Sequence, residues 1–411
     1  MKRLICITLT MALLMSVMVL STSAEIIKEE TTSGITGDCT WMLNNLGILT
    51  ISGNGKMASY GWYEAPWGSK CKKIIIEDGV KSIGSHAFDN CYNLDSVVLP
   101  DSLTGIGDYA FYNCANLTDV SLPEGLKGIG ESAFWNCTSF TSVDIPNSVK
   151  RIGSGAFYNC KSMRKLTIGD SVTSIGLSAF SDCKSLTSAV IPDSLLYIDY
   201  CLFSNCSALQ SVTIGNSVTR ISEYAFKGCS NLTSVEMPNS IKRIDGSAFY
   251  DCKSLTNIII PDSVCEIGES AFFGCTSLLS ITLPESIIDI YDLAIGYYFD
   301  DEEWEKATIE GFVIYGYAGT EAERYAKNNN LLFVALEKND LKLGDVDGDG
   351  EVTIIDATLI QRHLAEIPVY AYNEAAADTD GDGEVTIIDA TCIQRYLVQL
   401  PAPERIGKPI T

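Results

Sequence analysis

Hydrophobic positions in the middle of the chain recur every 23 residues. Phenylalanine holds the same place in nine successive copies: Phe88, Phe111, Phe134, Phe157, Phe180, Phe203, Phe226, Phe249 and Phe272. A cysteine follows each of them three residues later, from Cys91 to Cys275. This fixed period, kept without an insertion, predicts a solenoid, because such a short unit cannot bury its apolar side chains without stacked neighbours.

Each copy predicts a short strand followed by turns. Apolar and polar positions alternate over residues 94–99, and Pro100 ends the strand because proline cannot donate to a ladder. Ile106 is followed by glycine, which other copies replace with aspartate or serine. These residues tolerate a left-handed or turn backbone. Residues 110–114 predict one helical or 3₁₀ turn.

The period also determines how the cysteines are interpreted. Nine of them occupy an inward position of the repeat, so we expect a ladder of buried thiols that act as small hydrophobic groups. Cys39 and Cys71, outside the ladder, are the one pair that we expect to form a disulfide.

The outward strand positions are mostly small and polar, as at Ser96, Ser188 and Ser211. One aromatic run, Tyr112, Trp135 and Tyr158, occupies consecutive copies and is a possible ligand strip. The alternative is ordinary packing of these rings over the turns.

The repeat resembles the BspA-like leucine-rich repeat family of bacterial surface proteins. The resemblance rests on Ile145-Pro-Asn-Ser-Val149 through Phe157 and Cys160, and again on residues 191–210. It implies an α/β leucine-rich-repeat solenoid with parallel strands and short helical turns, and a habit of binding without naming a ligand. Residues 36–70 and 312–336 resemble the end caps of the same family, so the tryptophans near the N-terminus are expected in the cap core.

A capping box of Thr320 and Glu323 predicts a helix in the C-terminal cap, and a last strand follows over 331–336. We expect these segments along the chain: a signal peptide at 1–24, a disordered lead (25–35) and N-terminal cap within 25–70, the solenoid at 71–295, a C-terminal cap at 296–337, a linker at 338–342, a calcium-binding module at 343–400 and a tail at 401–411.

Composition limits the classes of partner and of catalytic centre that the protein can have. The net charge of −23 argues against nucleic acid and against anionic membranes. Only two histidines are present, which makes a histidine-based catalytic or zinc centre unexpected. Residues 1–24 combine Lys2 and Arg3 with an apolar stretch and small residues before Glu25, which predicts secretion. A membrane anchor is the alternative, although the apolar stretch is short for a span.

Two acidic loops near the C-terminus match the twelve-residue pattern of calcium loops. Calcium prefers six to eight oxygen ligands, whereas magnesium takes fewer in a stricter octahedron. The expected ligands of two Ca²⁺ ions are Asp345, Asp347, Asp349, Glu351 (by its carbonyl), Thr353 (through water) and Asp356, and in the second loop Asp378, Asp380, Asp382, Glu384, Thr386 and Asp389. An acidic turn without a metal is the alternative.

Each loop precedes one amphipathic helix, and the duplicated unit resembles the type I dockerin of cellulosome components, a small all-α, duplicated calcium-loop (F-hand) module. The resemblance implies calcium-dependent folding and binding to a cohesin module of a scaffoldin. The family's contact positions correspond here to Ile354, Ile355, Gln361 and Arg362 and to Ile387, Ile388, Gln394 and Arg395. Their repetition would permit two binding orientations. The alternative places the isoleucines in the core.

The leading hypothesis is a secreted, non-catalytic cellulosome subunit at the cell surface, in the setting of polysaccharide breakdown. Its repeats would bind an unknown extracellular protein or glycan. One alternative is an enzyme subunit related to glycoside hydrolases, which need two carboxylates across a cleft that a regular solenoid does not offer. The other alternative is a purely structural spacer.

Overall fold

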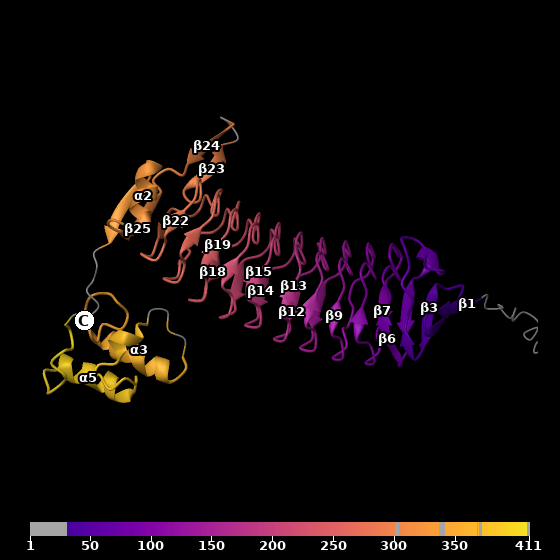
Figure 1. The fold of residues 1–411 in the computed structure, drawn as a ribbon, viewed down its shortest axis with the longest axis horizontal. Coiled ribbons are helices and arrows are strands. Elements are labelled where there is room, and N and C mark those ends of the chain that lie inside the picture. Colours follow the sequence, from indigo (N-terminus) through magenta and orange to yellow (C-terminus); the bar gives the residue numbers. More distant parts are fainter. Residues whose placement is uncertain (1–30, 301–303, 337–341, 368, 370–371, 409–411) are drawn as a thin grey trace, which may run out of the picture. The chain divides into compact units, whose positions relative to one another are not determined.

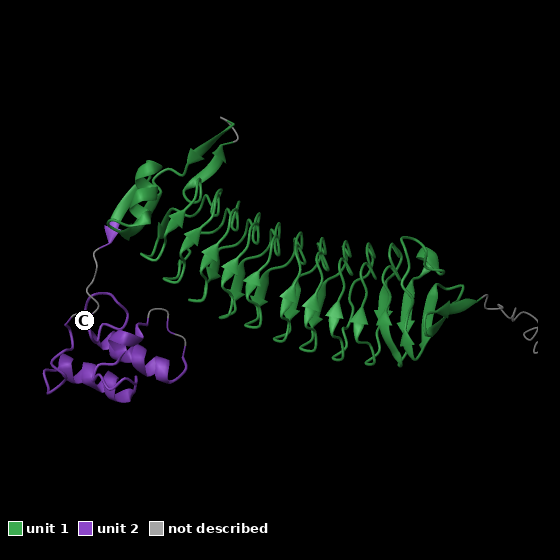
Figure 2. Cartoon of the chain, in the orientation of Figure 1, with its two compact units in different colours: residues 1–334 green, residues 335–411 purple. Residues whose placement is uncertain are grey.

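The fold is a computed structural model that describes residues 31–300, 304–336, 342–367, 369 and 372–408. The predicted signal peptide and nearly all of the predicted linker lie outside the described residues. The chain divides into two compact units, residues 1–334 and 335–411 (Figure 2). Each unit is described by itself. No helix in the described part of the chain has the length and apolar character needed to cross a membrane.

The first side of the solenoid is the predicted row of parallel strands (Figure 1). Partners in neighbouring strands are one period apart, as in the pairing of Ser142 with Lys165 and of Ile145 with Ile168. The prediction of stacked parallel strands is therefore confirmed. The strands are β5 (Lys73–Ile76), β7 (Ser96–Val98), β10 (Ser142–Ile145), β12 (Lys165–Ile168), β14 (Ser188–Ile191), β16 (Ser211–Ile214), β18 (Ser234–Glu236) and β21 (Ser280–Thr282).

A second side carries another row of parallel strands, which the sequence pattern did not reveal. Most are two residues long and end on the isoleucine that precedes the glycine position, so the alternation is too short to be seen in the sequence. They are β6 (Val80–Ile83), β8 (Gly105–Ile106), β9 (Gly128–Ile129), β11 (Arg151–Ile152), β13 (Ser174–Ile175), β15 (Tyr197–Ile198), β17 (Arg220–Ile221), β19 (Arg243–Ile244), β20 (Glu266–Ile267) and β22 (Asp289–Ile290).

The third side consists of tight turns, where we expected a helical turn. Tyr109 and Asn113 have φ values of 56° and 63°, which break any helix between them. Main-chain bonds still join successive turns, as where Phe111 N donates to Ala133 O over 2.7 Å. Asparagine side chains add a ladder, since Asn113 Nδ2 donates to Asn90 Oδ1 over 3.0 Å. Asparagine suits this position because it tolerates a left-handed backbone.

The glycine after the strand isoleucine has a different role from the one we expected. Gly107 and Gly130 do not adopt a positive φ. A Cβ on Gly130 would instead lie 2.5 Å from main-chain atoms of the preceding turn. Glycine is used here because neighbouring turns approach closely.

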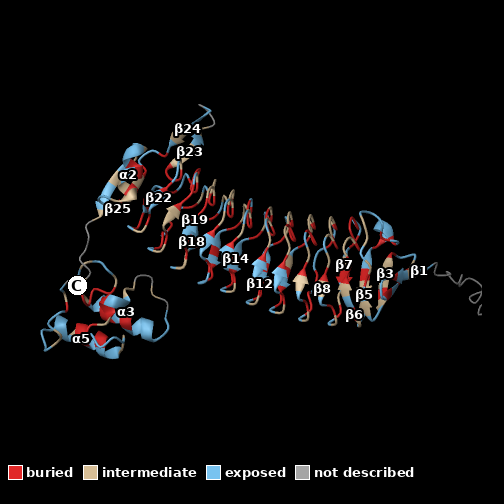
Figure 3. Ribbon diagram, viewed as in Figure 1, coloured by how far each residue is buried: buried red, intermediate tan, exposed pale blue. Residues whose placement is uncertain are grey.

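The predicted columns of phenylalanine and cysteine form the core, and the burial pattern follows them along the solenoid (Figure 3). Phe134 and Phe157 stack with ring centroids 5.2 Å apart. From Cys114 onward, each ladder thiol donates to the phenylalanine carbonyl of the preceding turn, as Cys137 Sγ does to Phe111 O over 3.2 Å. Burial raises the pKa of Cys137 to about 12.

The structure contains no disulfide among the described cysteines. The predicted disulfide between Cys39 and Cys71 is therefore wrong: both are buried free thiols. Cys71 instead lies next to Cys91 and helps to raise the pKa of that thiol, so it extends the ladder by one turn.

An antiparallel sheet closes the N-terminal end of the solenoid. It consists of β1 (Thr32–Thr36), β2 (Cys39–Leu43) and β3 (Ile48–Gly53), and β3 pairs in parallel with β5. A short β4 (Gly55–Lys56) and the 3₁₀ turn η1 (Gly68–Lys70) follow. Residues 32–35 were expected to be disordered but belong to β1. Trp41 and Trp67 lie in the cap core as expected, whereas Trp62 is 47% exposed.

The C-terminal cap begins with an unpredicted hairpin of β23 (Tyr297–Asp300) and β24 (Glu305–Thr308). The predicted strand, helix and strand follow as β25 (Val313–Tyr317), α2 (Glu321–Asn328) and β26 (Leu332–Leu336). The predicted capping box is wrong in its details. Thr320 is the N-cap, but its hydroxyl donates to Tyr317 O, and Glu323 accepts from Gly319 N.

The C-terminal unit contains helices α3 (Ile354–Leu364) and α5 (Ile387–Leu397) and a short α4 (Glu374–Ala377). Its main core is small: Val346, Ala357, Ile360, Ala377, Ala390 and Ile393. The segment predicted as a tail is part of this unit. Gly407 N donates to Leu343 O over 2.7 Å, and Ile406 is buried against Leu343 and Cys392.

Candidate metal centre and docking surface

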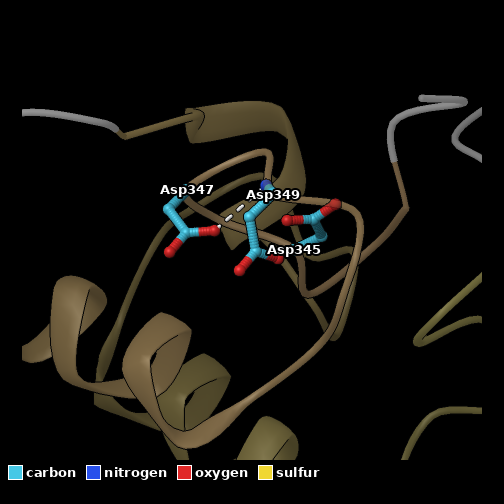
Figure 4. A group of neighbouring side chains, drawn as sticks. All are labelled: Asp345, Asp347 and Asp349. Atoms are coloured by element: carbon cyan, nitrogen blue, oxygen red, sulfur yellow. Dashed lines mark hydrogen bonds between the residues drawn. The ribbon is translucent and has the colours of Figure 1, made fainter. Parts of the chain in front are cut away.

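The first acidic loop brings three carboxylates together before α3. Asp345, Asp347 and Asp349 can each direct one oxygen so that all three lie within 4.8 Å of one another (Figure 4). The loop is held by its own main chain: Gly350 N donates to Asp345 Oδ2 over 2.9 Å, and Glu351 N donates to Asp349 Oδ1 over 2.8 Å. Three converging oxygens form part of the ligand shell that a hard divalent cation prefers.

One carboxylate oxygen of this loop is buried without a hydrogen-bond partner. Asp345 is fully buried, and its Oδ1 has no hydrogen-bond partner. Burial, together with the nearby carboxylates Asp356 and Asp349, raises the pKa of Asp345, and Asp347 shifts in the same direction. A buried anionic oxygen without a partner is costly. A bound calcium ion would supply the missing positive charge, so the residues present fit a calcium site.

The second loop repeats this arrangement with Asp378, Asp380 and Asp382, whose oxygens also come within 4.8 Å of one another. Asp378 is less buried than its counterpart Asp345. Both of its oxygens accept main-chain bonds, from Gly381 N over 2.8 Å and from Gly383 N over 3.0 Å. The two loops therefore carry the same predicted ligands but differ in their first aspartate: one oxygen of Asp345 has no partner, whereas both oxygens of Asp378 accept main-chain bonds.

The closing aspartates fasten each loop to its helix. Fully buried Asp356 accepts from Val346 N over 2.6 Å and from Thr353 N over 2.7 Å. Asp389 does the same for Thr379 N and Thr386 N. A carboxylate oxygen has more than one lone pair, so these bonds leave capacity for a metal. Thr353 and Thr386 are N-caps of α3 and α5, each within a capping box.

The remaining predicted ligands, Glu351 and Glu384, are exposed at their side chains, which suits a contribution through the main-chain carbonyl. Sequence reasoning missed two cations near the loops. Lys342 Nζ donates to Gly350 O over 2.7 Å, and the Arg405 guanidinium lies against Gly381. Isolated basic residues carry no recognisable pattern, so only the fold places them here.

The predicted docking residues lie at equivalent places on α3 and α5. Ile354 and Ile355 begin α3 and are 56% and 54% exposed, and Ile387 and Ile388 begin α5 with nearly equal exposure. The alternative that placed these isoleucines in the core is wrong. Gln361, Arg362 and Arg395 are also exposed, while Gln394 is half-buried.

On the repeats, the rings of the possible ligand strip do form a row. Trp135 stacks on Tyr158 with centroids 3.9 Å apart and lies 6.3 Å from Tyr112. All three are half-buried. Because the rings face one another, a ligand would meet their edges and hydroxyl groups. Binding by this strip stays a prediction.

The geometry defines a protein with a parallel-strand repeat solenoid and a small helical module with two metal loops. Comparison with known protein families identifies both parts. The chain belongs to the family of the BspA type leucine-rich repeat region, whose profile matches residues 67–187 and 175–299, in six copies. A dockerin type I domain matches residues 343–398.

Several solved structures that resemble the chain are bacterial leucine-rich repeat proteins. A leucine rich cell surface protein from Faecalibacterium prausnitzii is 28% identical, with 70% of this chain and 89% of that chain covered and a TM-score of 0.42. Leucine-rich repeat proteins from Bacteroides ovatus (23% identity, 75% and 99% covered, TM-score 0.41) and Eubacterium ventriosum (23%, 63% and 92%, 0.35) are also similar. A search of curated proteins found no match.

The two family matches indicate the class of protein to which the chain belongs and where it acts. Leucine-rich repeats and dockerins are non-catalytic kinds of module, and a dockerin implies calcium and a cohesin partner. Together they indicate an extracellular or cell-surface protein of the cellulosome type.

Proposed function

We propose that the protein is a secreted, non-catalytic cellulosome subunit. Its dockerin binds two calcium ions and attaches to a cohesin module of a scaffoldin. Its repeats present a binding surface for an extracellular protein or glycan, in the setting of polysaccharide breakdown. The strip Tyr112, Trp135 and Tyr158 is one candidate part of that surface.

One observation carries the docking proposal. Two adjacent isoleucines are more than half exposed at the start of α3, and the same pair is equally exposed at the start of α5. Exposed apolar pairs on a small module indicate an interaction site. Because both copies also carry glutamine and arginine seven residues further on, a cohesin can use either copy after half a turn of the module.

The test is capture of the full chain on immobilised type I cohesins in calcium. Replacing Ile354 and Ile355 with aspartate, or Ile387 and Ile388 with aspartate, should reduce affinity only about twofold, since one copy remains and half of the orientations are lost. Replacing all four should abolish capture. Leu279→Asp, on an exposed position of the repeats, is the control and should bind normally.

Chelator should release the captured wild-type chain. Full binding by the four-fold variant, or capture that resists chelator, would contradict the docking proposal.

A further inference from the structure

The second side of the solenoid has a shallow hollow of about 650 Å³ across β8, β9 and β11. It lies where Gly105 and Gly128 take the outward strand position, next to Arg151 in the following turn. Neither glycine has a positive φ, and a Cβ on Gly128 would meet its nearest atom at 3.7 Å. The backbone thus permits a side chain at Gly128, and the absence of one keeps the hollow open.

Three cations line this hollow in a chain whose net charge is −23. Lys127, Lys150 and Arg151 are exposed, and none forms an ion pair with another described residue. Lys127 and Lys150 occupy neighbouring turns, joined by the bond from Lys150 N to Lys127 O over 2.9 Å. Like charges on adjacent strands repel, so an anion placed between them is favoured.

The same register four repeats later shows how the chain neutralises such a cluster. There Arg220 and Arg243 both bind Asp245, over 2.6 and 2.7 Å, and Arg243 also binds Glu266. Gly153 stands in the hollow where Asp245 stands in that later repeat. Arg151 stands where Arg243 stands in that later cluster, whereas Gly128 replaces Arg220. The hollow therefore keeps one of the two arginines, beside Lys127 and Lys150, and omits the internal counter-ion.

The opposite end of the hollow is acidic and adjoins exposed rings. Asp108 and Glu131 also line it; Glu131 follows the segment that begins with Lys127, and Asp108 follows the preceding segment, which begins with Thr104. Glu131 lies four residues after Lys127, a distance of at most roughly 13 Å along an extended chain. Tyr109 Oη donates to Glu131 Oε1 over 2.7 Å, and the Tyr109 ring lies 5.1 Å from the exposed ring of Trp62.

Backbone strain marks the same rings. His86 and Tyr109 stack 4.8 Å apart, although both have left-handed φ values near 55°. Most other turns place small residues there, such as Ser132, Gly155 and Ser178, although Tyr224 and Leu293 hold the same position further along. Bulky residues in this conformation are strained, and retained strain of this kind accompanies functional surfaces.

We propose that this hollow binds an acidic polysaccharide that carries uronate groups. The cations take the sugar carboxylate, Asp108 and Glu131 accept from sugar hydroxyls, and the ring of Trp62 offers apolar contact. A ligand with both carboxylates and hydroxyls fits the two ends, whereas an acidic peptide or a simple anion fits only the cationic end. The choice of a polysaccharide as the ligand rests on the proposed function. The inference that the hollow binds an anion rests only on its unpaired cations.

The test is affinity electrophoresis of the full chain in calcium with polygalacturonate in the gel. Fully methyl-esterified polygalacturonate and polyglutamate serve as comparison polymers. The wild type should be retarded most by polygalacturonate, less by polyglutamate, which meets only the cations, and not by the methyl ester. Lys150→Ser with Arg151→Ser should weaken retardation about tenfold, which corresponds to about 1.4 kcal/mol.

The matched control is Lys242→Ser with Arg243→Ser, which removes the same charges from the same register four repeats later. It should bind like the wild type. Gly128→Glu should weaken binding and Gly128→Gln should do so less, since only the first adds a counter-charge. Thermal melts check that each variant is folded.

No retardation of the wild type, equal losses for the two double variants, or equal retardation by polyglutamate would overturn the proposal. Cohesin capture of the same variants shows whether a loss of polysaccharide binding is independent of docking. A variant that loses polygalacturonate but keeps the cohesin shows that the two surfaces fail independently.

Discussion

The solenoid and the dockerin satisfy their buried polar groups in different ways. In the solenoid, cysteine thiols donate to phenylalanine carbonyls and asparagine side chains bond their neighbours one turn away. In the dockerin, Asp345 is fully buried, and one of its oxygens has no protein partner. A repeat array can complete its bonds with copies of itself, whereas the short module leaves a buried carboxylate oxygen that a cation would satisfy, and we therefore expect its folding to depend on calcium.

The largest expected effect comes from the calcium loops. Asp345→Ala should prevent folding of the dockerin even in calcium, because it removes a buried ligand at the start of the loop. Asp378→Ala should be milder, since Asp378 is less buried and its loop is already held by main-chain bonds. Calorimetric titration of each full-length variant with calcium measures both effects. Equal losses would show that the structural difference between the loops has no energetic weight.

The next largest effect tests the solenoid core. Phe157→Ala should lower the free energy of unfolding of the repeats by about 3–5 kcal/mol, the usual range for a buried phenylalanine. Urea denaturation checks this, with Val190→Ala, on an exposed strand position, as the control. An unchanged urea midpoint for the Phe157 variant would disprove the inward ladder.

Thiol labelling at a chosen pH tests the burial of the cysteine ladder in the solenoid. Burial raises the pKa of Cys183 and Cys229 to about 12, so both stay protonated at pH 8. Their contribution to stability is present below the unfolded thiol pKa of about 8.5 and is lost as the pH rises toward 12. A thiol reagent at pH 8 should label the partly exposed Cys201 and Cys265 first. Rapid labelling of the ladder thiols in the folded chain would contradict their burial.

The smallest effect separates hydrogen bonding from packing in the cysteine ladder. Cys160→Ser keeps a donor to Phe134 O, which Cys160 Sγ meets at 3.4 Å, and Cys160→Ala removes it. The alanine variant should be less stable than the serine variant by about 1 kcal/mol, the usual net value of such a bond. Urea midpoints of the two variants decide the matter, and a more stable alanine variant would assign the cysteine to packing alone.

The features that follow from the 23-residue period could be predicted from the sequence, whereas the second row of strands and the turn geometry could not. The columns of Phe157 and Cys160 and the strands over residues 142–145 follow from one period. The second row of strands escaped detection because two residues such as Gly128–Ile129 give no alternation. The turn around Tyr109 was expected to be helical because its apolar spacing resembles a helical turn, while the left-handed residues that break it carry no hydrophobic signal.

The site was predicted in a similar way. The carboxylates of the loops follow from a fixed spacing, and the structure brings Asp345, Asp347 and Asp349 together. Lys342 and Arg405 escaped prediction, since they reach the loops from segments that carry no motif. The hollow beside Lys127 also escaped, because it needs the second row of strands to exist.

The central claim is that one chain joins a metal-independent solenoid to a metal-dependent docking module. Hydrogen exchange of the full chain, measured by mass spectrometry with calcium and with chelator, tests it most directly. The account predicts that residues 343–408 lose protection in chelator while the turns from Phe88 to Phe272 exchange at unchanged rates. Protection of the dockerin that persists without calcium, or loss of protection throughout the repeats, would contradict it.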